Sequence, residues 1–507
     1  MNSYANVSFI RPFAHTKKLV VSLALLLYAL LAMGLIENSS GLFAYALLLM
    51  GYVYAEAKNL WVCERHLFWI NPVILATLST FVMGFGISNI LYLLPEDTLA
   101  ILGIDPYVTL WMNHLMLLVV MGAVAMWAGY GSGLGRALGI KWQRSQLLHK
   151  WISTSSLVNK PAIYAFLAIS LTMRLWAVKL GIYGYSAYYD NLISAQNYTQ
   201  YFSLGASLGQ LVLVGMALQC FSSSNSSLLD RALLWSLVGI EVTSGFLSGF
   251  KSTVVMPMII VGVVYYTQRN RFPRWLVPAV LVGIMTAYAV IEPFRIARYE
   301  DAGFVETDLN NIASTMYSAY RDSISINNPE TPSWVLRFLS RSNLTYIGSL
   351  GIEYAASGEL PSESPAFLGD IILAPAHAII PRFLWESKSL QNIGLWYSRE
   401  VMGNRLSISS TGMSPFTYLN FAGGPLAVIL IFFVVGALQR ALFDGLSHRD
   451  GGGLMILLGL LGTLGTIDSA VNSFFIGIIR NLPILIIAQY ILLRRSNQQG
   501  VREEQLP

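Results

Sequence analysis

The run YLNFAGGPLAVILIFFVVGALQRA (Tyr418–Ala441) decides the fold class of this chain. It carries one charged residue, Arg440, near its end, and about 20 mostly apolar residues are enough to cross a bilayer as an α-helix. Similar runs recur along the 507 residues, of which 55% are hydrophobic and 12% charged. A soluble domain carries roughly 25% charged residues. The composition therefore predicts an all-α, polytopic membrane protein with little soluble mass.

About twelve runs are candidate spans on this criterion. They are Leu19–Ile36, Leu42–Ala57, Pro72–Leu94, Val108–Tyr130, Pro161–Val178, Ser203–Phe221, Ala232–Ser248, Thr253–Gln268, Trp275–Ile291, Tyr418–Ala441, Gly453–Ile467 and Val471–Leu493. We interpret the first as an uncleaved span rather than a signal peptide, because it is long and no A-x-A cleavage site follows it cleanly.

The distribution of basic residues predicts the topology. If the N-terminus is cytoplasmic, the connections rich in Lys and Arg all fall on the cytoplasmic side, as the positive-inside rule requires. The opposite connections, ENSSG, PEDTLAILGIDP and GTIDSA, are acidic or neutral. We therefore expect both termini inside. The net charge of +5 follows from the same rule, and no basic module interleaved with aromatics indicates a nucleic-acid partner.

This topology divides the chain into three segments. Residues 1–291 hold nine spans, residues 292–419 form a large periplasmic loop, and residues 420–507 hold the last three spans and a cytoplasmic tail. A loop of this length in a compact protein is usually functional. Both cysteines, Cys63 and Cys220, are expected on the cytoplasmic side, so the loop must be held by packing against the spans rather than by disulfides.

The loop carries nine basic residues, which the positive-inside rule does not explain: Arg295, Arg298, Arg321, Arg337, Arg341, Arg382, Lys388, Arg399 and Arg405. Arg295 and Arg298 follow Glu292 at the exit of the ninth span and share one face if the helix continues. Two guanidiniums on one face suit a pyrophosphate. The alternative is a pair of anchors to lipid phosphates.

A second basic and aromatic cluster lies in the segment PRFLWESKS, with Arg382 and Lys388. His377, just upstream, is the only histidine of the loop and is a candidate general base, although a lone histidine is more often structural. Arg341 follows Arg337 by one helical turn. The cluster can instead form part of an interfacial belt of Arg and Trp.

Three charges fall where the bilayer disfavours them: Arg174 near the outer end of the fifth span, Lys251 at an outer turn, and Arg480 inside the last span. Such residues often line a polar cavity, and the alternative is snorkelling to the headgroups. For Arg480 a further alternative is a structural ion pair with Asp468 or Glu241. Tyr188 and Tyr189, in a tyrosine-rich exterior loop, are candidate saccharide contacts.

Several classes of protein are disfavoured. The chain has no P-loop, no G-x-S-x-G and no H-E-x-x-H, and so lacks the usual signatures of nucleotide hydrolysis, serine hydrolases and metalloproteases. It has no compelling acidic cluster or Cys/His set, so we expect neither a metal nor a cofactor. Internal symmetry, typical of many transporters, is not evident.

The pattern of spans, cytoplasmic termini and one late, arginine-edged exterior loop resembles the Wzy-type polymerases, which join O-antigen or oligosaccharide repeat units of bacterial surface polysaccharides. The local matches are SGFKS around Lys251, FRIAR around Arg295 and Arg298, and the PR-x-x-W-x-x-K pattern formed by Pro381, Arg382, Trp385 and Lys388. The proline expected after this lysine is Ser389 here.

This resemblance implies a GT-C-like bundle in the inner membrane and a metal-independent glycosyltransferase. Its substrates would be oligosaccharides linked to undecaprenyl pyrophosphate, with a Wzz-type chain-length regulator and a flippase as possible partners besides membrane lipids. Arg295, Arg298 and Arg382 would stabilise the pyrophosphate, with Arg174 and Lys251 nearby and Glu292 or His377 as base. An O-antigen ligase, and a flippase or other transporter, are the alternatives.

Overall fold

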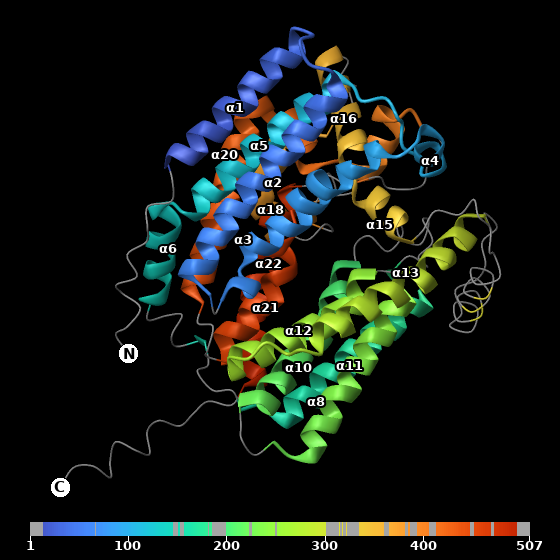
Figure 1. Cartoon of the computed structure of the whole chain (residues 1–507). Helices are drawn as coiled ribbons and strands as arrows, with labels where there is room; N and C mark the ends of the chain where they lie inside the picture. Colours follow the sequence, from blue (N-terminus) through green and yellow to red (C-terminus); the bar gives the residue numbers. More distant parts are fainter. Residues whose placement is uncertain are drawn as a thin grey trace. The chain divides into compact units, whose positions relative to one another are not determined.

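The computed structural model describes residues 14–65, 67–145, 151–152, 157–180, 182–184, 199–222, 226–248, 251–300, 314, 317, 321, 334–358, 365–380, 384–385, 393–404, 412–446, 451–467 and 471–493. Across these residues every regular element is a helix and no strand forms (Figure 1). The all-helical class expected from the apolar runs is thereby confirmed.

Each expected span coincides with helical structure. Six of the described helical segments are long and apolar enough to cross a membrane: Asn38–Cys63, Pro72–Leu93, Leu110–Tyr130, Lys160–Lys179, Pro415–Gly445 and Val471–Leu492. Shorter apolar helices cover Ser207–Ser222, Leu276–Ala287 and Gly451–Gly465. The protein therefore has several candidate membrane-spanning helices, and the count of twelve crossings and their orientation stay predictions.

The helices divide into two compact units built from segments that are far apart in the sequence. Unit 1 consists of residues 1–144, 331–445 and 460–480, and unit 2 of residues 145–330, 446–459 and 481–507.

Unit 1 contains the helices of the first 144 residues, those of the long loop from residue 334 onward, and the long helix that follows the loop. They are α1 (Ala14–Ala32), α2 (Asn38–Cys63), η1 (Phe68–Ile70), α3 (Pro72–Ala76), η2 (Thr77–Gly86), η3 (Ile87–Leu93), α4 (Glu96–Ile101), α5 (Leu110–Tyr130), α6 (Gly133–Gln143), α15 (Trp334–Ser342), α16 (Thr345–Ser357), α17 (Phe367–Ile372), α18 (Ala374–Ile379), α19 (Ile393–Trp396), η6 (Tyr397–Val401) and α20 (Pro415–Gly445). Helices α21 (Gly451–Gly465) and α22 (Val471–Leu492) are divided between the units: the last part of α21 and the first part of α22 belong to unit 1.

The centre of unit 1 is the crossing of α5 and α20, which Figure 1 shows side by side with α1 and α2. Glycines set the distance between the two helix backbones. A Cβ added at Gly129 would lie 1.9 Å from the carbonyl oxygen of Phe433, and one at Gly436 would lie 1.9 Å from that of Met126. Small residues permit this close approach where hydrophobic burial alone cannot drive helix association.

The described residues of the long loop from 334 onward belong to unit 1. Helix α16 packs against α5 and α20, and the Thr417 hydroxyl of α20 donates to the Gly348 carbonyl at 2.9 Å. Asn343, between α15 and α16, donates to the Ser88 carbonyl at 3.1 Å and to Asn89 Oδ1 at 3.2 Å. Cys63 and Cys220 are both free thiols, so packing and these hydrogen bonds hold the segment.

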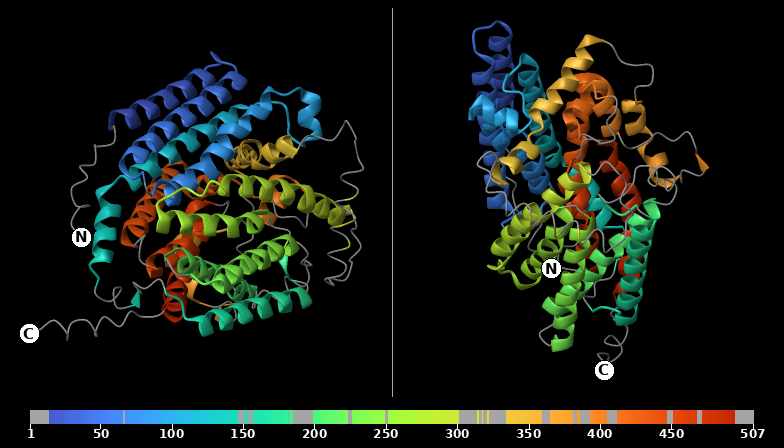
Figure 2. Two further views of the ribbon diagram at one scale, coloured as in Figure 1. Left: turned by 60° about the horizontal axis from the view of Figure 1, so that its bottom comes forward. Right: turned by 90° about the vertical axis from the view of Figure 1, so that its right-hand side faces the viewer.

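Unit 2 is a second helical bundle, seen from two further directions in Figure 2. It contains α8 (Lys160–Lys179), α10 (Thr199–Ser222), α11 (Leu228–Ser248), α12 (Lys251–Arg269) and α13 (Leu276–Glu300), with the first part of α21 (Gly451–Gly465) and the last part of α22 (Val471–Leu492). Helix α10 packs against α8, α11 and α12, and α12 also packs against α13. The central position of α10 brings side chains of α8 and α11 together.

Candidate functional site

The site that stands out in unit 2 is a buried ion pair between α8 and α11. Nη2 of Arg174 lies 2.8 Å from Oε1 of Glu241 and donates to Oε2 at 2.9 Å. Arg174 is 9% exposed and Glu241 is 5% exposed. Because both carboxylate oxygens contact one guanidinium nitrogen, the pair fixes the position of a positive charge inside an apolar bundle, where an isolated charge would be costly.

A glycine on α10 makes room for this pair. A Cβ added at Gly209 would lie 2.2 Å from Glu241 Oε1 and 2.9 Å from both Arg174 Nη2 and Ser170 Oγ. Any side chain at this position would overlap the carboxylate. Glycine at this position of α10 thus leaves the space that the charged groups of α8 and α11 occupy.

A cavity of about 470 Å³ adjoins Arg174. Its aliphatic lining residues are Leu171, Leu175, Val178, Ile240 and Leu247, and its polar ones are Arg174, Tyr183, Ser236, Thr243 and Ser244. The Tyr183 hydroxyl donates to the carbonyl of Ser244 at 3.1 Å, which ties the chain after α8 to α11. The cavity therefore combines apolar walls with one guanidinium and several hydroxyls.

The structure assigns Glu241 to Arg174 and not to Arg480, the partner weighed from the sequence. Arg480 is half-buried in α22, and its buried Nε has no hydrogen-bond partner among the described residues. Asp468, the other partner considered, lies outside the described residues.

For the basic cluster at the exit of the ninth span, the structure describes the backbone. Helix α13 continues without a break to Glu300, as the expected shared face of Arg295 and Arg298 requires. The structure does not describe the side chains of these two arginines and of Glu292. The same holds for the side chain of Lys251 at the start of α12.

The second predicted cluster belongs to unit 1. His377 in α18 is 4% exposed and its ring lies 5.0 Å from that of Trp385. The structure thus brings together the only histidine of the loop and the tryptophan of the PR-x-x-W-x-x-K pattern. Arg341 is exposed at the end of α15. Arg382, Lys388, Tyr188 and Tyr189 lie outside the described residues.

Sequence reasoning missed a polar network in unit 1 around Arg440, which the sequence showed only as the one charged residue of its apolar run. Its Nη1 lies 2.6 Å from Glu64 Oε1, its Nε lies 2.6 Å from Asp444 Oδ2, and its guanidinium carbon stands 5.1 Å from the ring centroid of Tyr130. The i,i+4 spacing of Arg440 and Asp444 was a visible signal, whereas Glu64 is 376 residues away. Among the described residues, no three His, Cys, Asp or Glu side chains come together as a metal site.

A family model described as a domain of unknown function (DUF8712) matches residues 161–453. This range covers more than half of the chain, which therefore belongs to that family. The matched range begins at the first turn of α8 and includes Arg174, Glu241, the long loop and α20. No curated protein and no solved structure matches the chain.

Proposed function

We propose that this DUF8712 protein is a glycosyltransferase of the inner membrane that joins undecaprenyl-pyrophosphate-linked oligosaccharide repeat units into a surface polysaccharide on the periplasmic side. The twelve-span, GT-C-like architecture expected from the sequence belongs to this proposal. It rests on the resemblance carried by the short motifs and on one observation in unit 2.

That observation is the aliphatic cavity beside the Arg174–Glu241 pair. A polyprenyl pyrophosphate is a long apolar chain that ends in two phosphate groups. The leucines and valine of the cavity match the chain, and a guanidinium matches phosphate through charge-assisted hydrogen bonds. Glu241 holds the Arg174 guanidinium in one orientation until a phosphate oxygen competes for it. The charge pattern of the sequence predicts that this end of α8 lies toward the periplasm.

The reaction joins two lipid-linked sugars. A hydroxyl oxygen of one repeat unit forms a bond to the anomeric carbon of the other, while the bond from that carbon to the pyrophosphate oxygen breaks. The proton of the hydroxyl passes to a base, for which Glu292 and His377 are the proposed residues, and undecaprenyl pyrophosphate leaves with the electron pair. Arginines that contact the pyrophosphate would stabilise the charge that develops on it, and Arg295, Arg298 and Arg382 are the proposed residues.

Deletion of the gene, followed by electrophoresis of the surface polysaccharide, tests the activity. A polymerase leaves chains of a single repeat unit when it is lost. Loss of all attached repeats would instead point to the ligase or flippase and would overturn the proposal.

Complementation with Arg174→Gln tests the site. We expect shortened chains in cells where expression of the variant has been adjusted to wild-type abundance, because the guanidinium that meets the phosphates is gone. Lys179→Gln is the matched control, since Lys179 is exposed at the end of the same helix and should restore full chain length. Full-length chains from a stably expressed Arg174→Gln variant would show that Arg174 is not part of the site. The same result with Arg295→Ala, Arg298→Ala and Arg382→Ala would show this for those three residues.

A further inference from the structure

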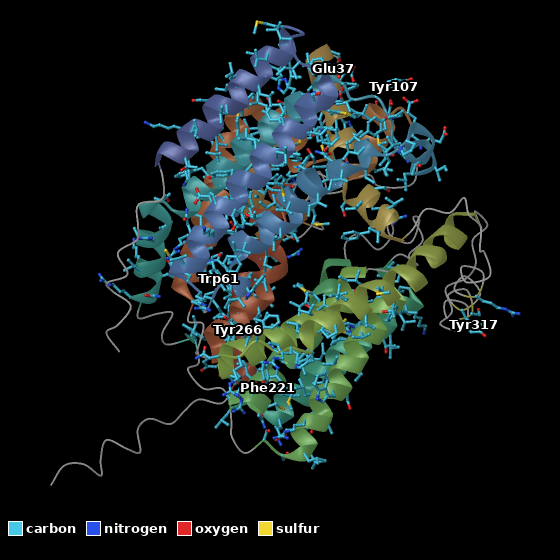
Figure 3. The ribbon with its side chains drawn as sticks, in the orientation of Figure 1. Glu37, Trp61, Tyr107, Phe221, Tyr266 and Tyr317 are labelled. Carbon is cyan, nitrogen blue, oxygen red and sulfur yellow. The ribbon has the colours of Figure 1, made fainter. Side chains whose placement is uncertain are left out.

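A second cavity of about 610 Å³ lies in unit 2, around the end of α10 and the end of α12. Three arginines line it: Arg231 in the first turn of α11, Arg269 at the end of α12, and Arg271 in the turn that follows. Phe221 of α10, labelled in Figure 3, lies at this end of the bundle, as does Tyr266 of α12. Arg231 and Glu241 are ten residues apart on α11, about 15 Å along the helix, so this cavity is separate from the one at Arg174.

The charges around the cavity are positive. Among the described residues, none that line it is a carboxylate. The nearest acidic residue in the sequence, Asp230, is buried and lies 2.7 Å from Lys160 Nζ, so its charge is already paired. Arg231 Nε donates to the Ser226 hydroxyl at 3.1 Å. Arg269 and Arg271 form no ion pair with any described residue. The cavity therefore presents positive charge that the described part of the chain does not neutralise.

Aromatic rings form part of the wall. The rings of Phe221 and Tyr265 meet edge to face with centroids 5.2 Å apart. Trp235 meets Trp275 in the same manner at 5.9 Å. These contacts give the cavity walls that do not depend on the arginine side chains.

The positive-inside rule accounts for basic residues in this connection, but it does not require them to converge on one cavity. Arg274 illustrates the difference, because it belongs to the same turn and is exposed yet does not line the cavity. A guanidinium can donate two parallel hydrogen bonds to phosphate oxygens. Basic pockets between helices on the cytoplasmic side suit phosphorylated headgroups.

We propose that this cavity is a binding site for a phosphate group, borne either by the headgroup of an anionic lipid or by a small soluble phosphate. The site is independent of the proposed glycosyl transfer, because it shares no residue with the cavity at Arg174. A bound phosphate would bridge the ends of α11 and α12 through Arg231, Arg269 and Arg271.

The test measures binding to the purified full-length protein in detergent micelles. The probes are a short-chain phosphatidylglycerol, the matching phosphatidylcholine, and inorganic pyrophosphate. The wild-type protein should bind phosphatidylglycerol or pyrophosphate saturably, and an Arg269→Gln/Arg271→Gln variant should bind about tenfold more weakly or worse. Arg274→Gln removes one charge of the same surface and should bind as the wild type does.

The three probes distinguish a lipid headgroup from a small soluble phosphate. Saturable binding of phosphatidylglycerol that pyrophosphate does not displace assigns the site to a lipid headgroup, and tighter binding of pyrophosphate assigns it to a soluble phosphate. Equal binding of phosphatidylcholine, saturable binding of neither anion, or an equal loss in Arg274→Gln would overturn the proposal. Because Arg269 and Arg271 are exposed, the double variant should unfold at the wild-type temperature. If it does not, Arg269→Lys/Arg271→Lys keeps the charge and should recover part of the affinity.

Discussion

Arg174 and Glu241, which are 67 residues apart in the chain, form an ion pair with 2.8 Å between Nη2 and Oε1 in the interior of unit 2. A buried pair is weak evidence for stability, because the cost of removing two charges from water approaches the gain from their attraction. The pair lies beside the cavity, where the proposed function gives the guanidinium a phosphate to bind.

A double-mutant cycle should separate these contributions. Arg174→Met and Glu241→Leu should each destabilise unit 2 by about 3–5 kcal/mol, because each leaves a buried charge without its partner. The double variant should lose less than the sum of the two, since it removes both charges together. Unfolding of the purified protein in mixed micelles measures the three variants. Additive losses would show that the two charges do not stabilise each other.

Gly209→Ala should weaken the same ion pair while both charged residues are kept. The added Cβ would lie 2.2 Å from Glu241 Oε1, so the carboxylate must move or the helices must separate. We expect a lower unfolding temperature and shorter polysaccharide chains. The control is Gly283→Ala on α13, where an added Cβ comes no nearer than 3.6 Å to another side chain and alanine favours the helix. Equal stability of the two variants would contradict the predicted crowding.

The positions of the helices followed from the sequence more closely than the site did. A membrane-spanning helix is long and apolar over its whole length, so runs such as Val471–Leu493 reveal it directly, and α22 spans Val471–Leu492. The rotation of each helix about its axis leaves no such signal when every face is apolar. Glu241 was therefore visible as a buried charge, but its pairing with Arg174 rather than Arg480 depended on how α8, α10 and α11 pack. The network of Asn89, Asn343 and Thr345 was hidden for the same reason.

Asn343→Leu should loosen residues 334–358 of the long loop from the rest of unit 1. Besides its contacts with Ser88 and Asn89, the Asn343 side chain accepts a hydrogen bond from the Thr345 amide at 2.9 Å. Thr345 in turn donates to Asn89 Oδ1 at 2.8 Å. Loss of the amide leaves buried polar groups unsatisfied, at about 1–3 kcal/mol for each.

Limited proteolysis measures this release, with faster cleavage expected in residues 334–358. Ser357→Ala is the control, because Ser357 is exposed at the end of α16. Unchanged cleavage of Asn343→Leu at a lower global stability would mean that the network supports the core of unit 1 rather than the loop.

The Lys160–Asp230 pair should make unit 2 sensitive to acid. The hydrogen bond from Lys160 lowers the pKa of the Asp230 carboxyl below its usual value. A carboxyl whose pKa is lowered by folding contributes stability above its unfolded pKa, about 3.9, and loses it as pH falls through the folded pKa. Wild-type unfolding temperatures should therefore drop below about pH 4, and Asp230→Asn and Lys160→Gln should both show a smaller drop. Superimposable pH profiles would rule out this contribution.

The break inside α20 should depend on Gly424. Its φ of 66° and ψ of −157° belong to a region that only glycine occupies without strain. It precedes Pro425, whose ring prevents a regular helix from continuing. Gly424→Ala should therefore cost about 1–3 kcal/mol, although an added Cβ meets no atom within 4 Å. The comparison is Gly51→Ala in α2, which is equally open but helical, and which should stabilise by roughly 0.5–1 kcal/mol. Stability changes of opposite sign at these two uncrowded glycines would attribute the cost at Gly424 to the backbone conformation. If Gly424→Ala left the stability unchanged, α20 would be able to straighten without penalty.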